Sequence, residues 1–331
     1  MPTTSTTTLP MGLTIRSPKM EDVQAVFDLF SVCEMADDGT ITYTRQNVVD
    51  YWQAPDVDME TDVWLVANEK GQLVGYADSG HRMHVTLFSD VHVHPDYRNQ
   101  GIENVLLRLT EERARQHIAE APAHARVTLN SWISHNDKML PTLFEQAGYS
   151  MIRSHWRMRI DMNEAPPVPE LPEHVTIRAF VRRQDDQAVF DADEEAFQDH
   201  WGHLPDTFEH WEYWTVKREG FDPSLWFLAV EGNKIAGLAL CSYENGEGWV
   251  NNLAVRRPWR KQGLGLALLR QAFGEFYRRG THVVGLGVDA QNLTGATRLY
   301  TRAGMHVAVQ HDTYQKELRP GEELSTQSVS E

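Results

Sequence analysis

The pattern of hydrophobic and polar positions is most informative between Val250 and Arg279, where a strand and then a helix are predicted. The strand, Trp249–Val255, is rich in large apolar and β-branched residues. Apolar residues then recur at steps of three and four, which is typical of an amphipathic helix packed on a sheet: Leu266, Leu269, Ala272, Phe273, Phe276 and Tyr277. A further apolar run, His282–Val288, predicts the next strand.

The loop between this strand and helix, which we call the glycine loop, is basic and reads Arg260-Lys261-Gln262-Gly263-Leu264-Gly265. Backbone N–H groups at a helix N-terminus have no partner inside the helix, and glycine lets an anion approach them closely. The loop therefore predicts a pyrophosphate cradle. It lacks the Gly-Lys-Ser/Thr of nucleotide triphosphatases and the three-glycine spacing of dinucleotide-binding folds.

The same pattern occurs twice along the chain. Thr14 and Thr176, Gly75 and Gly237, and Gly101 and Gly263 are each 162 residues apart. After the long helix the offset becomes 156, which pairs Asn136 with Asn292 and Gly148 with Gly304. The chain is thus predicted to hold two copies of one unit.

Each copy has the same predicted order of elements, which gives an α/β fold with a mixed central sheet flanked by helices. The expected strands are Leu13–Arg16, Trp64–Asn68 and Leu73–Ser79 in the first copy, and Val175–Phe180, Trp226–Glu231 and Lys234–Tyr243 in the second. We place the domains at residues 12–162 and 174–318, joined by a proline-rich linker, 163–173, in which regular pairing is blocked.

Composition narrows the class of partner. The formal net charge of −16 over 331 residues disfavours nucleic acid and favours a cationic or amine-bearing substrate. Two cysteines cannot form a disulfide framework, which indicates a reducing compartment. With no predicted signal peptide or membrane-spanning stretch, we expect a cytoplasmic protein that does not act on membranes.

The Arg-x-x-Gly-x-Gly loop resembles the coenzyme A loop of the GNAT superfamily of acyl-CoA N-acyltransferases. The following order of elements is similar too: a strand, Asn292, and then residues 296–305, ATRLYTRAGM, in which Met305 replaces the family's usual phenylalanine. The tandem arrangement resembles mycothiol synthase and related two-domain acyltransferases.

The resemblance implies roles for specific residues of the second copy. Cofactor contacts would come from Leu253, Ala254, Val255, Arg260, Lys261, Gln262, Gly263, Leu264, Gly265 and Asn292. An N–H of the strand would stabilise charge on the thioester oxygen. Tyr300 would donate a proton to the leaving thiolate, for which phenol and thiol pKa values of roughly 10 and 8.5 are suitable. The alternative is that Tyr300 only packs in the core.

The general base is less clearly indicated. Many relatives use a glutamate on the strand before the loop, and here Glu247 lies at the start of that strand. Alternatively, Asn251 or Asn252 could hold a water that relays the proton, and Glu247 would then be a solvated turn residue.

The acceptor would be selected by the helical segment 193–203 of the second copy. We expect Glu195, Asp199, His200 and Trp201 there to bind it, with carboxylates holding an ammonium group and His200 or His203 able to act as a base. The alternative is a solvated helix surface with Asp199 as a capping residue.

The first copy departs from the family at two positions. Glu103 stands where the second copy has Gly265, and a carboxylate there would repel pyrophosphate. Phe144 stands where the second copy has Tyr300. We therefore predict a degenerate first domain with a structural or substrate-shaping role; the alternative is that it binds coenzyme A loosely without turnover.

Four histidines of the first copy, His81, His84, His92 and His94, are close in sequence and could suggest a metal. No cysteine or suitably spaced carboxylate completes such a set, so no metal is predicted.

The sequence thus predicts an N-acetyltransferase that moves an acetyl group from acetyl-CoA directly to a primary amine on a small molecule or peptide. A mycothiol-type precursor, an aminoglycoside-like amine and a protein N-terminus are all open as acceptors, and the chain is expected to be a monomer or homodimer. The alternative from another class is a non-catalytic acyl-CoA sensor.

Overall fold

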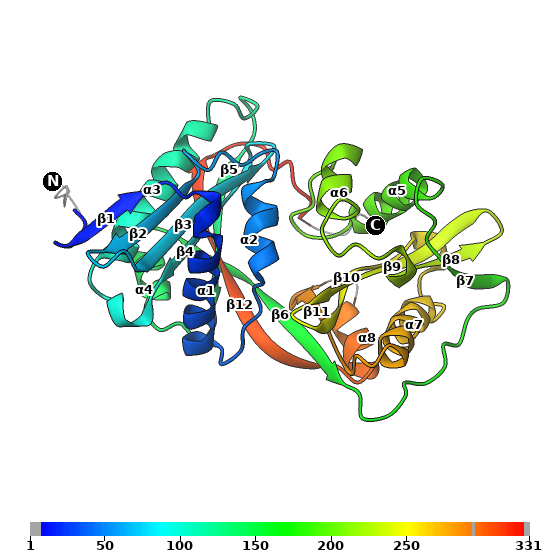
Figure 1. Ribbon diagram of the computed structural model, residues 1–331. Coiled ribbons are helices and arrows are strands. Elements are labelled where there is room, and N and C mark those ends of the chain that lie inside the picture. Colours follow the sequence, from blue (N-terminus) through cyan, green and yellow to red (C-terminus); the bar gives the residue numbers. More distant parts are fainter. Residues whose placement is uncertain (1–7, 293–294, 328–331) are drawn as a thin grey trace. The chain divides into compact units, whose positions relative to one another are not determined.

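The chain packs as two compact units in a computed structural model that describes residues 8–292 and 295–327. Unit 1 contains residues 8–153 and His311–Leu324, and unit 2 contains residues 154–292, 295–310 and 325–327. Figure 1 shows the elements of each unit in chain order. Within the described residues, no helix has the length and apolarity needed to cross a bilayer.

Unit 1 is a mixed sheet in the order β1-β2-β3-β4-β5-β12, in which only β4 and β5 run parallel. Its elements are β1 (Leu13–Arg16), η1 (Met20–Asp22), α1 (Val23–Asp37), α2 (Arg45–Trp52), β2 (Val63–Asn68), β3 (Leu73–Arg82), β4 (Thr86–Val93), η2 (Pro95–Tyr97), α3 (Ile102–His117), β5 (Val127–Ser134), α4 (Leu140–Gln146) and the second part of β12 (His306–Arg319).

Unit 2 repeats this plan in the order β6-β11-β10-β9-β8-β7, with β10 and β11 parallel. Its elements are β6 (Ser150–Asp161), β7 (Val175–Ala179), α5 (Asp186–Phe197), α6 (Phe208–Trp214), η3 (Pro223–Leu225), β8 (Trp226–Glu231), β9 (Lys234–Glu244), β10 (Glu247–Val255), η4 (Arg257–Trp259), α7 (Leu264–Arg278), β11 (Val283–Asp289) and α8 (Ala296–Arg302).

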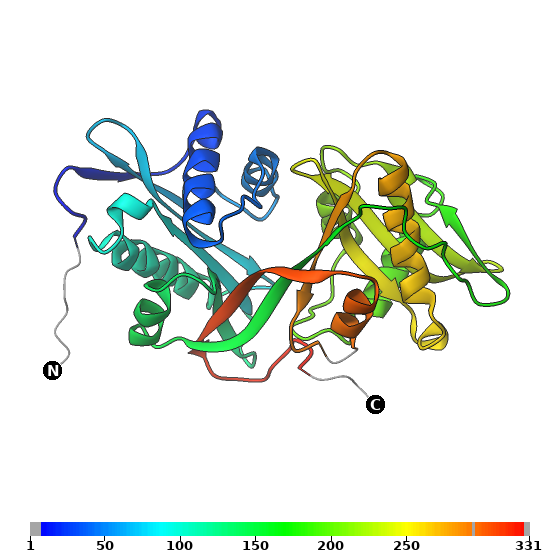
Figure 2. The ribbon, with the colours of Figure 1, turned by 90° about the horizontal axis from the view of Figure 1, so that it is seen from below.

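The closing strand of each sequence copy pairs with a strand of the other unit. β6 follows α4 of the first copy but pairs with β11 from His155 to Asp161. β12 closes the second copy, and its residues from His311 onward pair with β5. The parts of β6 and β12 within unit 2 also lie side by side (Figure 2), joined by a hydrogen bond from Trp156 Nε1 to Gln310 Oε1 at 3.0 Å.

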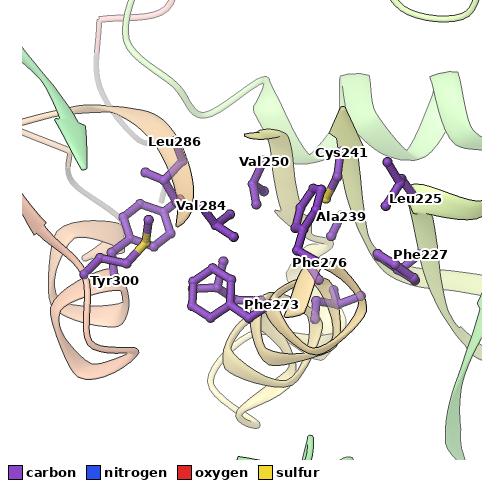
Figure 3. Close-up of a cluster of buried hydrophobic side chains, with 14 of the residues drawn as sticks. Leu225, Phe227, Ala239, Cys241, Val250, Phe273, Phe276, Val284, Leu286 and Tyr300 are labelled. Atoms are coloured by element: carbon purple, nitrogen blue, oxygen red, sulfur yellow. The ribbon is translucent and has the colours of Figure 1, made fainter. Parts of the chain in front are cut away.

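The two faces of the unit 2 sheet bury alternate residues of each strand against different helices. On one face, Phe227 and Cys241 pack with Phe273 and Phe276 of α7 (Figure 3). On the other face, Trp226 and Leu228 pack with α5 and α6 residues such as Val189, Ala196 and Trp211. Unit 1 has matching cores, with α1 and α2 on one face and α3 on the other. The predicted mixed sheet flanked by helices is confirmed.

Candidate active site

The glycine loop has a backbone that exposes N–H groups at the start of α7. Lys261 and Gly263 both have left-handed backbones, with φ of 63° and 83°. Gly263 is the N-cap, and no side chain caps the helix. A Cβ on Gly265 would lie 3.5 Å from Leu299 Cδ2, an ordinary contact, so this glycine is not required by local packing. The N-terminal N–H groups of α7 are thus open to an anion.

Arg260 and Gln262 hold this loop in shape. Arg260 donates to the Val255 carbonyl at 2.9 Å, to Asp199 Oδ2 at 2.9 Å and to the Ala196 carbonyl at 3.2 Å. Gln262 Nε2 donates to the Pro258 carbonyl at 3.2 Å. Arg260 thus fixes the loop to β10 and α5, and Gln262 fixes it to η4. Any contact of these two side chains with pyrophosphate would come in addition to these bonds.

The first copy builds the same loop from equivalent residues. Arg98 donates to the Val93 carbonyl at 3.2 Å and to Asp37 at 2.7 and 2.8 Å, and Gln100 Nε2 donates to the Asp96 carbonyl at 3.1 Å. Asn99 and Gly101 repeat the left-handed backbones, with φ of 64° and 91°.

One contact distinguishes the two loops. In the first copy the Glu103 carboxylate is buried and accepts a hydrogen bond from the Asn99 backbone N–H at 3.1 Å. A backbone donor of this loop is therefore already bonded to a carboxylate of the same chain. Gly265, at the equivalent position in unit 2, has no side chain that could do this.

A cavity of about 810 Å³ opens beside the glycine loop within unit 2. Several predicted residues line it together: Leu253, Ala254, Val255, Arg260, Lys261, Gly263, Leu264, Gly265, Tyr300 and His200. Gln262, Asn292, Glu195, Asp199, Trp201 and Glu247 are not among the lining residues. Asn292 lies in the turn after β11, where its N–H donates to the Asp289 carbonyl at 3.0 Å.

The strands that border this cavity diverge. Among the described residues, β10 pairs with β11 only at Gly248–Val284 and Trp249–Gly285, whereas β10 continues beside β9 as far as Val255. A register shift between Val250 and Asn252 marks a bulge on the way. Leu253–Val255 therefore presents backbone groups that β11 does not pair, which a ligand's amides could use.

Tyr300 lies at the edge of the cavity, on α8. Its side chain belongs to the buried cluster of Figure 3 and is 7% exposed. No hydrogen bond joins its hydroxyl to any residue in 8–292 or 295–327. Burial raises the pKa of Tyr300 to about 12, so the phenol carries its proton at neutral pH.

The predicted acceptor-binding carboxylates are instead paired with arginines near the loop. Glu195 accepts from Arg256 Nε at 2.8 Å. Asp199 is buried and accepts from Arg257 Nε at 3.1 Å as well as from Arg260. The hydrogen bonds from these arginines lower the pKa of Asp199 to about 2, so it is ionised throughout the physiological range.

The two remaining predicted acceptor residues have different surroundings. His200 lines the cavity, packs against Phe197 with ring centroids 4.4 Å apart, and has a pKa lowered mainly by burial. Trp201 donates from Nε1 to Gln327 Oε1 at 2.8 Å. Only His200 therefore lines the cavity near the candidate acid.

Glu247 lies at the far end of β10. Its carboxylate accepts from Arg159 at 2.9 Å, and Arg157 lies 3.8 Å away. Leu253 lies six positions further along the chain, which corresponds to about 20 Å along a strand. The structure does not bring Glu247 to the cavity of Tyr300.

Asp193 lies in the segment expected to select the acceptor but was not singled out from the sequence, and the structure places it on the buried face of α5. It is 6% exposed; its Oδ2 accepts from Asn252 Nδ2 at 2.7 Å and from Trp211 Nε1 at 3.3 Å, while its Oδ1 is buried with no partner in the described chain. Burial raises the pKa of Asp193 to about 7. Its spacing with Val189, Ala192 and Ala196, all on the buried helix face, is the signal that could have found it.

A second cavity of about 390 Å³ lies along β10 in unit 2. Asn252, which contacts Asp193, lines this cavity, and its neighbour Leu253 lines the first. Aromatic side chains form much of the wall of this second cavity, including Trp214, Tyr243 and Trp249. Two ligands could therefore approach the same stretch of β10 from the two cavities.

Comparisons with known proteins agree with this arrangement. The family model described as the acetyltransferase (GNAT) family matches residues 23–131 and again residues 187–305. A mycothiol acetyltransferase from Arthrobacter sp. (strain FB24) is 30% identical over 223 residues, which are 64% of this chain and 64% of that protein. The match thus spans less than two thirds of that relative's length.

Solved structures show the same fold over nearly the whole chain. A GCN5-related N-acetyltransferase from Sphaerobacter thermophilus is 39% identical, with a TM-score of 0.84 over 96% of this chain and 100% of that one. A tandem GNAT protein from the clavulanic acid biosynthesis pathway has a TM-score of 0.72 at 17% identity, over 94% and 100% of the two chains.

The prediction of two tandem GNAT domains is therefore confirmed by the two family matches and by the tandem structural neighbour. The chain belongs to the acetyltransferase (GNAT) family.

Proposed function

We propose that the chain is an N-acetyltransferase whose unit 2 moves an acetyl group from acetyl-CoA to a primary amine. One observation carries this proposal: a single cavity is lined by the open glycine loop, by the edge of β10 that β11 does not pair and by Tyr300. The pyrophosphate would bind the N–H groups at the start of α7, and the pantetheine amides would pair with Leu253–Val255.

Tyr300 would then lie near the sulfur. In direct transfer the amine nitrogen attacks the thioester carbonyl carbon, the C–S bond breaks, and the departing thiolate takes the tyrosine proton. With a pKa of about 12, Tyr300 carries this proton at neutral pH. Solvent returns a proton to Tyr300 after products leave.

The amine must lose a proton to a base, and two carboxylates are candidates. Glu247, which the sequence favours, pairs with Arg159 at the far end of β10. Asp193 contacts Asn252, which lines the second cavity, and has a pKa of about 7, a value suited to proton transfer near neutral pH. We favour Asp193, with a water on Asn252 as the link to the amine.

The acceptor is proposed to enter the 390 Å³ cavity. Its aromatic wall and the nearby carboxylates suit an amine attached to a partly apolar body. Because the Arthrobacter relative is named a mycothiol acetyltransferase, a mycothiol-type precursor is the first acceptor to test.

Free thiol release from acetyl-CoA, measured across a panel of amines with the whole chain, tests the proposal. An amine-dependent rate that Tyr300→Phe strongly reduces is expected. Tight acetyl-CoA binding with no turnover on any amine, and the same binding in Tyr300→Phe, would favour the alternative of a non-catalytic acyl-CoA sensor.

A further inference from the structure

Three histidine rings gather in unit 1, away from its glycine-containing loop. His81 comes from β3, His84 from the turn between β3 and β4, and His117 from the end of α3. One ring nitrogen from each lies within 4.8 Å of those of the other two. The ring centroids are 3.9 Å apart for His81–His84, 4.6 Å for His81–His117 and 5.2 Å for His84–His117.

These rings leave buried nitrogens without hydrogen bonds. His117 is 6% exposed, and its Nε2 has no partner in the described chain; the same holds for His81 Nδ1. The rings' mutual hydrogen bond, His84 Nδ1 to His117 Nδ1 at 3.1 Å, uses other atoms. Buried polar atoms are nearly always satisfied, so two orphaned nitrogens in one cluster indicate a missing partner.

The loop that carries His84 has an uncommon backbone. Met83 and His84 both have left-handed backbones, with φ of 51° and 56°. They belong to the three-residue loop Met83–Val85 between the paired residues Arg82 and Thr86, and left-handed backbones are uncommon for residues other than glycine. Histidine is among the residues that adopt this backbone more often than most, so the loop accommodates His84 and holds its ring beside His81.

We propose that His81, His84 and His117 bind one divalent transition-metal ion of the zinc class. Neutral imidazole nitrogen is a preferred donor for zinc, and three protein ligands leave one coordination position open. The exposed Glu120 carboxylate lies 3.9 Å from His84 Nε2, and a water could supply the fourth ligand.

The ring geometry requires one modest adjustment. Zinc–nitrogen bonds of about 2.0–2.1 Å in a tetrahedron place imidazole centroids about 5 Å apart. The two pairs that include His117 are already near this separation, and the stacked His81–His84 pair at 3.9 Å must open by about 1 Å. His84 lies in a half-buried turn and is the ring best able to move.

This proposal departs from the sequence-based expectation of no metal. That expectation grouped His81 and His84 with His92 and His94. In the structure, His92 and His94 have other partners: His92 bonds Asp90 at 2.9 Å, and His94 Nδ1 accepts from the Asp96 N–H at 3.2 Å. The third ligand, His117, comes from a helix distant in sequence. The metal would tie the β3–β4 hairpin to α3, a structural role independent of acetyl transfer.

The test uses the full chain, stripped with a chelator and titrated with zinc by calorimetry and with cobalt by visible absorption. We expect one ion per chain and the intense d–d bands of tetrahedral cobalt. His84→Gln and His117→Gln should each weaken binding by at least roughly tenfold, because losing even an outer partner of a metal ligand costs about 10–100-fold.

His124→Gln is the matched control, because His124 is exposed and lies outside the cluster. It should bind metal like the wild type. Circular dichroism checks folding, and His84→Gln, in the hairpin turn, keeps the test valid if the buried His117 variant does not fold. No saturable binding by the wild type, or equal affinity in His84→Gln, would overturn the proposal.

Discussion

The carboxylate of Glu103 accepts a hydrogen bond from the backbone N–H of Asn99, 3.1 Å away, at the start of α3. Unit 2 has Gly265 and Lys261 at these positions, on a loop with the same left-handed backbones. The first copy thus bonds its own carboxylate to the loop, whereas the second has no side chain at that position. The first two predictions follow from this difference between Glu103 and Gly265.

Gly265→Glu should abolish acetyl-CoA binding. The new carboxylate would bond the loop as Glu103 does and would repel pyrophosphate at close range. Calorimetry measures the affinity, and Gly265→Ala is the control, because a Cβ there makes only an ordinary contact with Leu299. Unchanged affinity in Gly265→Glu would mean that the cradle lies elsewhere.

Substitution in the first loop should leave turnover nearly unchanged. Glu103→Gln keeps the size of the side chain and removes its charge, and no step proposed for unit 2 needs that charge. The measurement is kcat and KM for acetyl-CoA, with circular dichroism to check folding. A crystal soaked with acetyl-CoA that showed the thioester only in unit 1 would reverse the assignment.

Asp199→Asn should weaken acetyl-CoA binding through the loop's shape. The Asp199 carboxylate holds both Arg257 and Arg260, and an asparagine at this position would lose the charge that holds them. We expect a loss of roughly tenfold in affinity, about 1.4 kcal/mol. The matched control is Asp37→Asn, which breaks the equivalent pair with Arg98 in unit 1. Equal losses in both variants would indicate a general effect on folding.

Asp193 should make stability fall as pH rises. Its folded pKa of about 7 is above the ordinary value of about 3.9, so the folded state holds the proton more tightly than the unfolded state. That stabilisation is full below about pH 4 and is lost as pH rises to about 7. Asp193→Asn cannot ionise and should not show this loss.

Urea unfolding at pH 5 and pH 8 measures the effect. The unfolding free energy of Asp193→Asn relative to wild type should increase by roughly 2–3 kcal/mol between these two values. If Asp193 is also the base, this variant loses the limb of the kcat profile near pH 7, and Glu247→Gln keeps it. A pH profile changed only by Glu247→Gln would indicate that Glu247 is the general base.

Local patterns allowed much of the fold to be predicted. The periodicity of apolar residues predicts strands such as Trp226–Glu231 and the helix after the glycine loop. This periodicity can be read from neighbouring residues without knowing the tertiary contacts. The repeat offset of 162 also relates the two arginine–aspartate pairs, Arg98–Asp37 and Arg260–Asp199. The exchange of β6 and β12 was not predicted, because an apolar strand pattern does not specify which sheet the strand joins.

The site was less accessible to sequence reasoning because burial depends on tertiary contacts. Asp193, Glu195 and Asp199 are similar as acidic residues in one segment, but Asp193 faces the core while the other two pair with arginines. Glu247 was chosen for its strand, and its distance from the cavity depends on where β10 and β11 diverge. His117 was missed because only folding brings α3 to the β3–β4 turn.

Tyr300→Phe tests the acid directly. The ring stays in its buried cluster, so the fold and the affinity for acetyl-CoA should survive. General acid catalysis contributes roughly 10²–10⁴ in rate, and the loss should appear in kcat far more than in KM, because the interaction develops only as the thiolate leaves. Acyl donors with a more acidic thiol need less protonation, so the deficit should shrink with them. A variant with nearly wild-type kcat would assign Tyr300 to core packing, and the thiolate would then take its proton from water or from the incoming ammonium.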